Sequence, residues 1–163
     1  MKQLILVRHG KAYGPEEMFE DVDRPLKVRG TRDAITIAKI MKDKHIIPEK
    51  IITSHAARAC HSAIIFAECL HVPIESITLT PRLYAVSEKD IIEQIYETDE
   101  KINSLLMVGH NPTFTFAANE YLKEPIFDLP TSGVVVLNFK AESWKTISKE
   151  NLTSFELFFP KKD

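Results

Sequence analysis

The chain has 163 residues, of which 44% are hydrophobic and 27% charged, which is typical of one globular domain, and we expect a single domain over 1–163. Its formal net charge of −2, from 21 basic and 23 acidic residues, argues against a general binder of nucleic acid or of membrane surfaces. No apolar run has the length of a membrane span or of a signal peptide, and the two cysteines are expected to be free thiols, so we expect a cytoplasmic protein.

The first half of the chain alternates strand patterns with helix patterns. The apolar run over 2–7 predicts a buried strand, which a polar loop follows. From about residue 28, apolar side chains spaced three and four positions apart predict a helix, and 50–53 predicts a short second strand. Ser54 is a residue type that caps helices, so we expect it to begin the next helix.

The second half continues the alternation and then changes. The expected elements, in chain order, are a strand at 74–79, a helix from Ser87 to about Glu97, a strand at 104–108, a helix that begins near Pro112, and late strands at 134–139 and 154–158. Strands that alternate with helices imply a mainly parallel sheet covered on both faces. The late pair has no long helix between its strands, so we expect an α/β three-layer sandwich whose sheet is mixed at one edge.

Two of the predicted strands lead directly into histidines. Arg8-His9-Gly10 follows the first strand, and Gly109-His110-Asn111-Pro112 follows the strand at 104–108. Open α/β folds bind ligands at the carboxyl ends of their strands. We therefore expect one site built from both segments.

These segments resemble the histidine phosphatase superfamily and, within it, the short bacterial phosphohistidine phosphatases of the SixA type. The matching segments, in the order of the family, are Leu6-Val7-Arg8-His9-Gly10-Lys11-Ala12, Asp21-Val22-Asp23-Arg24-Pro25-Leu26 with Gly30, Ser54 with Arg58-Ala59, and Gly109-His110-Asn111-Pro112. One departure is His55, where the family usually has proline. The resemblance implies a phosphoglycerate mutase-like fold and a phosphatase that needs no metal and no other cofactor.

His9 is the expected nucleophile of such an enzyme. A neutral imidazole can attack phosphorus in line and form a covalent phosphohistidine, which water then hydrolyses. One ring nitrogen must be free for the attack, and the other must donate a hydrogen bond that fixes the tautomer. We expect a backbone carbonyl in the following loop to accept that bond.

Cations and hydrogen-bond donors should surround the phosphoryl oxygens. Arg8, Arg58 and His110 are expected to act with His9 in catalysis, because preset donors stabilise the charge that spreads over three oxygens in the transition state. The expected phosphate- or substrate-binding residues are Arg24, Ser54, Gly10 and Asn111.

The proton donor to the leaving group has more than one candidate. Asp21 matches the acidic position of the family, three residues before Arg24-Pro25. Asp23 and Glu88 are alternatives, and a phosphoramidate leaving group can need no dedicated acid.

The resemblance implies hydrolysis of phosphohistidine on a signalling protein, such as a histidine phosphotransfer domain, and hence a role in signal transduction. The short segment between Leu79 and Ser104 leaves little room for the lid of larger relatives, and an open site suits a protein side chain. One alternative is a small-molecule phosphomonoesterase acting on a phosphorylated metabolite. Another is a non-catalytic module that binds phosphate or phosphohistidine. Neither nucleic acid nor a membrane is an expected partner.

Overall fold

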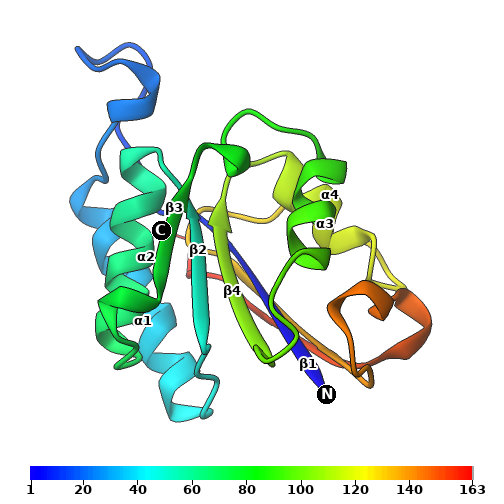
Figure 1. Cartoon of the computed structure of the whole chain (residues 1–163). Coiled ribbons are helices and arrows are strands. Elements are labelled where there is room, and N and C mark those ends of the chain that lie inside the picture. Colours follow the sequence, from blue (N-terminus) through cyan, green and yellow to red (C-terminus); the bar gives the residue numbers. More distant parts are fainter. Residues whose placement is uncertain (163) are drawn as a thin grey trace.

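The computed structural model describes residues 1–162, so Asp163, the last residue of the expected domain, lies outside the described residues. Six strands form one sheet in the order β3-β2-β4-β1-β5-β6 (Figure 1). The strands are β1 (Lys2–Arg8), β2 (Lys50–Ser54), β3 (Ile77–Thr80), β4 (Ser104–Gly109), β5 (Val134–Phe139) and β6 (Leu152–Phe158). The first four strands are parallel to one another, whereas β5 runs antiparallel to both β1 and β6. The predicted sheet, parallel at its centre and mixed at one edge, is confirmed.

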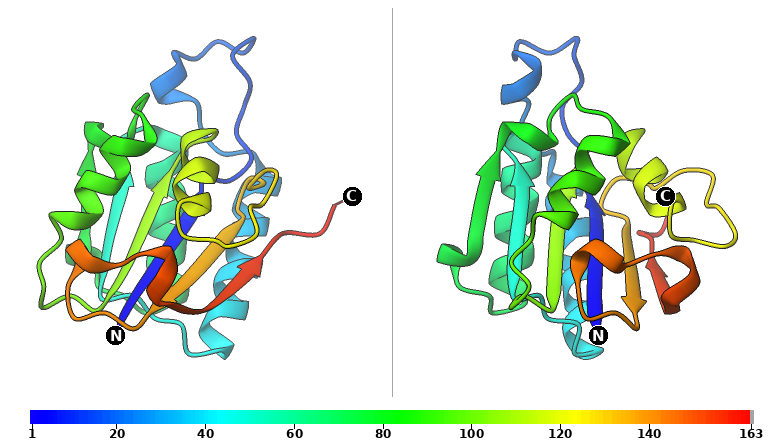
Figure 2. Two further views of the ribbon diagram at one scale, coloured as in Figure 1. Left: turned by 90° about the vertical axis from the view of Figure 1, so that its right-hand side faces the viewer. Right: turned by 45° about the vertical axis from the view of Figure 1, so that its right-hand side comes forward.

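Helices cover both faces of this sheet (Figure 2). They are α1 (Val28–Asp43), α2 (Ala57–Cys69), α3 (Glu88–Tyr96) and α4 (Thr113–Asn119), and short 3-10 helices lie at 21–23, 74–76, 81–83, 144–146 and 149–151. One core packs α1 and α2 on the sheet, and the other packs α3 and α4 on the opposite face. The predicted three-layer sandwich is therefore confirmed, and no helix within residues 1–162 is long and apolar enough to cross a membrane.

The apolar run in β1 is continuous because the strand is buried on both faces. Leu4 and Leu6 belong to the core under α3 and α4, while Ile5 and Val7 belong to the core under α1 and α2. Successive side chains of a strand point to opposite faces, so a strand between two helical layers needs an apolar residue at each position.

Two helix starts differ in how well the sequence predicted them. Ser87 caps α3 as predicted, because its hydroxyl accepts from Asp90 N–H while the Asp90 carboxylate accepts from Ser87 N–H at 2.9 Å. The prediction that Ser54 caps the next helix is wrong, since α2 begins at Ala57. Strand β2 continues through Ser54, which pairs with Thr80 of β3, so the helix begins three residues later.

The register of β1 and β4 brings the two histidine segments together. Arg8 pairs with Gly109 in the parallel ladder, so His9 and His110 leave the sheet side by side at its carboxyl end. The loop between β1 and α1, in blue, rises above this end of the strands (Figure 1). The first turn of α1 packs closely under it, because a Cβ on Gly30 would lie 2.2 Å from the Lys11 carbonyl oxygen.

Candidate active site

A polar cavity of about 290 Å³ opens at the carboxyl ends of β1, β2 and β4. Its lining consists of Arg8, His9, Lys11, Ala12, Arg24, Arg58, His110, Asn111 and Thr131. Most of the residues that the sequence predicted for a site are in this set, although they are far apart in the chain. Its arginines and lysine make the cavity locally cationic in a protein whose net charge is −2, so it suits an anion.

His9 is held as a neutral ring with one nitrogen available. Its Nδ1 lies 2.8 Å from the Gly10 carbonyl oxygen, and because a carbonyl only accepts, Nδ1 carries the proton. Nε2 is therefore left with a free lone pair. Burial, followed by the neighbouring His110, Arg58 and Arg8, lowers the pKa of His9 to about 3. The ring is thus uncharged at neutral pH, as a nucleophile requires.

Gly10 supports His9 and has no free main-chain donor for a ligand. Its carbonyl accepts from His9, and its N–H donates to Ser62 Oγ at 2.9 Å. A Cβ at Gly10 would lie 2.9 Å from the Gly30 carbonyl oxygen, so the loop approaches α1 closely here. The expectation that Gly10 binds phosphate disagrees with this geometry, because its N–H is already bound.

His110 lies next to His9 at the cavity, with 5.1 Å between the ring centroids. Its Nε2 lies 2.8 Å from Ser54 Oγ, which also accepts from Ala56 N–H at 3.2 Å. The hydroxyl proton of Ser54 is then available for Nε2, which favours the tautomer that keeps the proton on Nδ1. Burial, followed by the charge of Arg58, lowers the pKa of His110 to about 4. Ser54 therefore orients His110 from the end of β2.

Several buried nitrogens around the cavity have no protein partner. Within residues 1–162 these include Nε of Arg8, Nε of Arg58 and Nδ1 of His110. An arginine Nε always carries a proton, and buried donors of this kind are normally hydrogen-bonded. The cavity thus gathers N–H donors for which the protein supplies no acceptor, as expected of a site that binds an anion.

Arg8 is oriented by the loop that precedes β5. Its Nη1 donates to the Leu129 carbonyl at 2.9 Å and lies 3.8 Å from an Asp128 carboxylate oxygen. Asn111 holds the same loop, since its Nδ2 donates to Asp128 and to the Leu129 carbonyl, while its Oδ1 accepts from Thr115. Asn111 therefore both lines the cavity and positions Arg8.

Arg58 and Arg24 meet at Asp21. Arg58, which is 5% exposed, donates from Nη1 to the Asp21 carbonyl at 2.6 Å and from Nη2 to Asp21 Oδ2 at 3.2 Å. Arg24 donates from Nε to Asp21 Oδ1 at 3.0 Å and from Nη1 to the Tyr13 carbonyl at 2.7 Å. One carboxylate thus holds two of the cavity's cations.

The ionisation of Asp21 disagrees with its expected role as proton donor. A hydrogen bond from the Tyr84 hydroxyl and the charge of Arg58 lower the pKa of Asp21 to about 2. The group is therefore a carboxylate at neutral pH and an acceptor of hydrogen bonds. Neither Asp23 nor Glu88, the alternative acids, is part of the cavity lining.

Lys11, Ala12 and Thr131 line the cavity but were not predicted as separate site residues, and Tyr84 was not predicted at all. Tyr84 follows the 3-10 helix at 81–83, just past the end of β3. Its position after a parallel strand was the one available signal, because such loops gather at the same edge of the sheet.

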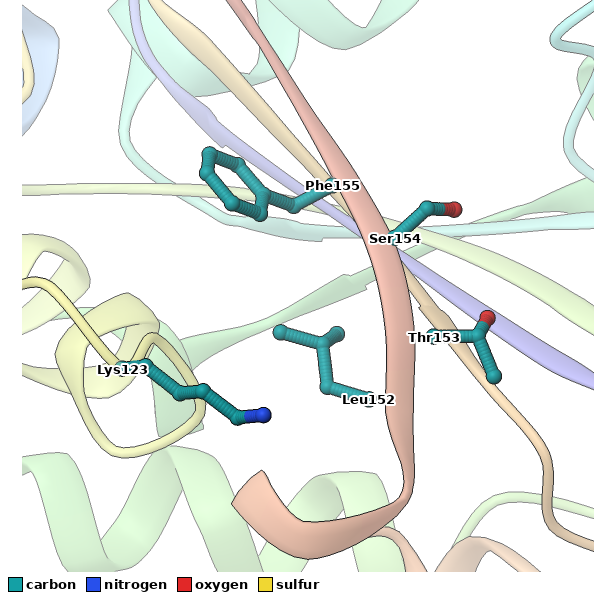
Figure 3. A pocket seen from close by; sticks show the side chains of 5 residues that line it. All are labelled: Lys123, Leu152, Thr153, Ser154 and Phe155. Atoms are coloured by element: carbon teal, nitrogen blue, oxygen red, sulfur yellow. The ribbon is translucent and has the colours of Figure 1, made fainter.

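A second hollow lies on the edge strand β6 and shares no residue with the site. It has a volume of about 340 Å³ and is bounded by Leu152, Thr153, Ser154 and Phe155 of β6 and by Lys123, which reaches toward Leu152 (Figure 3). Its polar side chains are the Lys123 amine and the Thr153 and Ser154 hydroxyls, and its lining includes no histidine, carboxylate or cysteine. The chemistry of the chain is thus concentrated at the cavity that contains His9.

Comparison with known proteins gives a family match and several relatives. The model of the histidine phosphatase superfamily (branch 1) matches residues 4–87. An uncharacterized protein of Mycobacterium leprae is 28% identical in an alignment of length 158 that covers 89% of this chain and 94% of the relative. Phosphoglycerate mutase 1 of Saccharomyces cerevisiae is 31% identical in an alignment of length 112 that covers 64% of this chain and 45% of the mutase.

Solved structures share the fold over most of the chain. A presumed phosphohistidine phosphatase SixA from Agrobacterium tumefaciens has a TM-score of 0.77 and 25% identity, over 85% of this chain and 92% of that one. The protein histidine phosphatase SixA complexed with tungstate has a TM-score of 0.76 and 20% identity, over 96% of this chain and 94% of that one. A mycobacterial glucosyl-3-phosphoglycerate phosphatase has a TM-score of 0.65 and 14% identity, over 99% of this chain and 100% of that one.

Proposed function

Because the chain belongs to the histidine phosphatase superfamily, we propose that it is a phosphatase that works through a phosphohistidine formed on His9. The observation that carries the proposal is the state of His9. Its ring is buried and neutral, Nδ1 is fixed by the Gly10 carbonyl, and Nε2 is free beside a cluster of cations.

The reaction proceeds in two displacements at phosphorus. In the first, the lone pair of His9 Nε2 forms a bond to phosphorus while the bond to the leaving group breaks, and that group takes a proton from solvent water because Asp21 is ionised. In the second, water attacks the phosphohistidine, inorganic phosphate is released with the proton of the water, and the ring returns to its neutral form. Arg8, Arg58 and His110 donate to the phosphoryl oxygens in both transition states.

The proposed substrate is a phosphohistidine side chain of a signalling protein, such as a histidine phosphotransfer domain. The likeness to SixA structures supports this choice, and a role in cytoplasmic signal transduction is part of the same proposal. A neutral imidazole is a good leaving group, which agrees with the ionised state of Asp21, because little acid catalysis is then required.

A small-molecule phosphomonoesterase is the second candidate. The structural likeness to a glucosyl-3-phosphoglycerate phosphatase favours it, since that enzyme has the same fold and acts on a phosphorylated metabolite. A non-catalytic phosphate-binding module would not require a free nucleophilic nitrogen on His9, so the geometry disfavours it.

The test compares substrates and then removes the nucleophile. A phosphorylated histidine phosphotransfer domain and a panel of sugar phosphates are assayed by phosphate release, and we expect the highest kcat/KM on the protein. His9→Ala should lower kcat by about a thousandfold or more, whereas His61→Ala, at an exposed position of α2, should not. The wild-type protein and His61→Ala should carry an acid-labile ³²P label after reaction with a labelled substrate, whereas His9→Ala should carry none.

Two results of the same assay would contradict the proposal. Full activity of His9→Ala on phosphoramidates would refute the mechanism, and a much higher kcat/KM on one metabolite would select the second candidate. Activity should also survive a chelator, because arginines supply the positive charge of the cavity.

A further inference from the structure

We propose that Tyr84 is a positioning residue of the site, whose hydroxyl holds the Asp21 carboxylate in the orientation that fixes Arg58 and Arg24 beside His9. This inference rests on the proposed function and assigns a role to a residue outside the motif segments. Tyr84 acts through Asp21, so it does not itself need to touch the phosphoryl group.

The backbone on both sides of Tyr84 is fixed. Before it, Leu83 is 1% exposed, and Thr80 Oγ1 accepts from Arg82 N–H at 3.1 Å at the start of the 3-10 helix. After it, Ala85 has a φ of 54°, in the left-handed region that residues with a Cβ rarely adopt. Such conformations persist where the surroundings enforce them, so the backbone that carries Tyr84 is held in place by the fold.

The side chain of Tyr84 meets three loops of the site. Its hydroxyl donates to Asp21 Oδ2 in the loop between β1 and α1. Its ring lies edge-on to His110, with centroids 5.5 Å apart, and to His55, with centroids 5.3 Å apart. Tyr84 thus connects the segments that follow β1, β2 and β4, where the cavity lies.

The contact with Asp21 matters because Asp21 holds the arginines. The side chain of Asp21 is 50% exposed, whereas that of Arg58 is 6% exposed. An exposed carboxylate has several rotamers open to it, and the phenol restricts the choice to the one that accepts from Arg58 Nη2. A guanidinium has five N–H donors, so the bonds to Asp21 leave others of Arg58 for phosphoryl oxygens.

Charged and titratable groups from several elements face Asp21. Arg24 comes from its own loop, Arg58 from α2, Tyr84 from the loop after β3 and His110 from the loop after β4, while His55 faces Tyr84. The arginines remain when the phenol is removed. The hydroxyl is the largest cause of the lowered pKa of Asp21, so removing it should raise that pKa.

A double-mutant cycle with Tyr84→Phe, Asp21→Asn and the pair tests the proposal, because the Phe ring keeps both aromatic contacts. In the wild-type background, Tyr84→Phe should lower kcat/KM roughly tenfold, as expected for one hydrogen bond to a charged group. In the Asp21→Asn background the same change should have less than about a twofold effect, because the acceptor charge is gone. Tyr96→Phe, on α3, is the control and should leave kcat/KM unchanged.

A readout that needs no turnover separates this proposal from the proposed function. Carboxyl ¹³C NMR of Asp21 should show a higher pKa in Tyr84→Phe than in the wild-type protein and in Tyr96→Phe. Equal losses of kcat/KM in both backgrounds would show that Tyr84 acts independently of Asp21, and an unchanged Asp21 pKa would show that the hydroxyl does not govern it; either result overturns the proposal. Wild-type protein without phosphatase activity would instead refute the proposed function, and the NMR comparison would still decide the role of Tyr84.

Discussion

At the scale of single residues, the site consists of groups whose ordinary charge the fold has changed or fixed. His9 and His110 are neutral at neutral pH because their pKa values are lowered, and burial is the largest cause in both cases. Asp21 is charged because Tyr84 and Arg58 donate to it. A neutral nucleophile and permanent cations are the combination that attack on a phosphoryl group requires, since the imidazole keeps its lone pair while the arginines receive the oxygens.

The lowered pKa values of the two histidines predict how stability depends on pH. The unfolded chain binds protons near the ordinary histidine pKa of about 6.5, while the folded protein resists protonation down to about 4 at His110 and about 3 at His9. Stability is thus complete above about pH 6.5 and is lost as the pH falls below it. Between pH 7 and pH 5 the loss should be roughly 2 kcal/mol for each histidine.

Urea unfolding at pH 7 and at pH 5 measures this loss. His9→Gln and His110→Gln should each make the free energy of unfolding less sensitive to pH, because the substituted side chain does not titrate. The lowered pKa of Asp21 acts in a separate window, where stability is lost only as the pH falls from about 4 toward about 2. Equal stability of the wild-type protein at pH 7 and pH 5 would show that the rings are not held neutral.

At the scale of elements, the carboxyl ends of the parallel strands assemble the site. The pairing of Arg8 with Gly109 puts the residues that follow β1 and β4 next to each other. Strand β2 ends at Ser54, which reaches His110, and α2 begins at Ala57, which puts Arg58 in its first turn. The strand ends and helix starts were predictable from apolar periodicity to within a few residues, whereas the pairing of β2 with β3 through Ser54 was not.

The contact between α1 and the loop after β1 predicts the effect of a substitution at Gly30. Gly30→Ala should destabilise the protein by about 2 kcal/mol or more, because the new Cβ would meet backbone atoms of Lys11 that cannot rotate away. The loop carries Gly10, which orients His9, so kcat should fall as well.

Chemical unfolding and the phosphatase assay together check the prediction for Gly30. Lys39→Ala, at an exposed position of the same helix, is the matched control and should change neither quantity appreciably. If Gly30→Ala were as stable and active as the control, the close approach of α1 to the loop would not constrain the site.

At the scale of the whole molecule, the two helical layers hold a sheet whose centre is apolar on both faces, and the polar chemistry is confined to one end of it. The cores keep β1, β2 and β4 in a fixed register. The cationic cavity at their ends is therefore preorganised before a ligand arrives, and binding an anion there should stabilise the entire fold.

Inorganic phosphate should raise the melting temperature of the wild-type protein. At a phosphate concentration ten times its Kd, the gain is about 1.4 kcal/mol, which corresponds to a shift of roughly 3–6 °C for a chain of this size. Arg58→Ala should lose most of that shift, because it removes a guanidinium of the cavity. Thermal unfolding with and without phosphate measures both, and a shift of equal size in Arg58→Ala would place the anion elsewhere.

The sequence by itself determined the layered fold and the residues with obvious chemistry. Hydrophobic periodicity is local, so it identified the strands and helices, and the motif segments identified Arg8, His9, Arg58 and His110. Only the tertiary structure decided what each polar group does. Asp21 and Tyr84 are 63 positions apart, and Asn111 and Asp128 are 17 apart, yet each pair is hydrogen-bonded. Hydrogen bonds and pKa values depend on distances and burial in space, which the packing of the loops sets after the strands have paired.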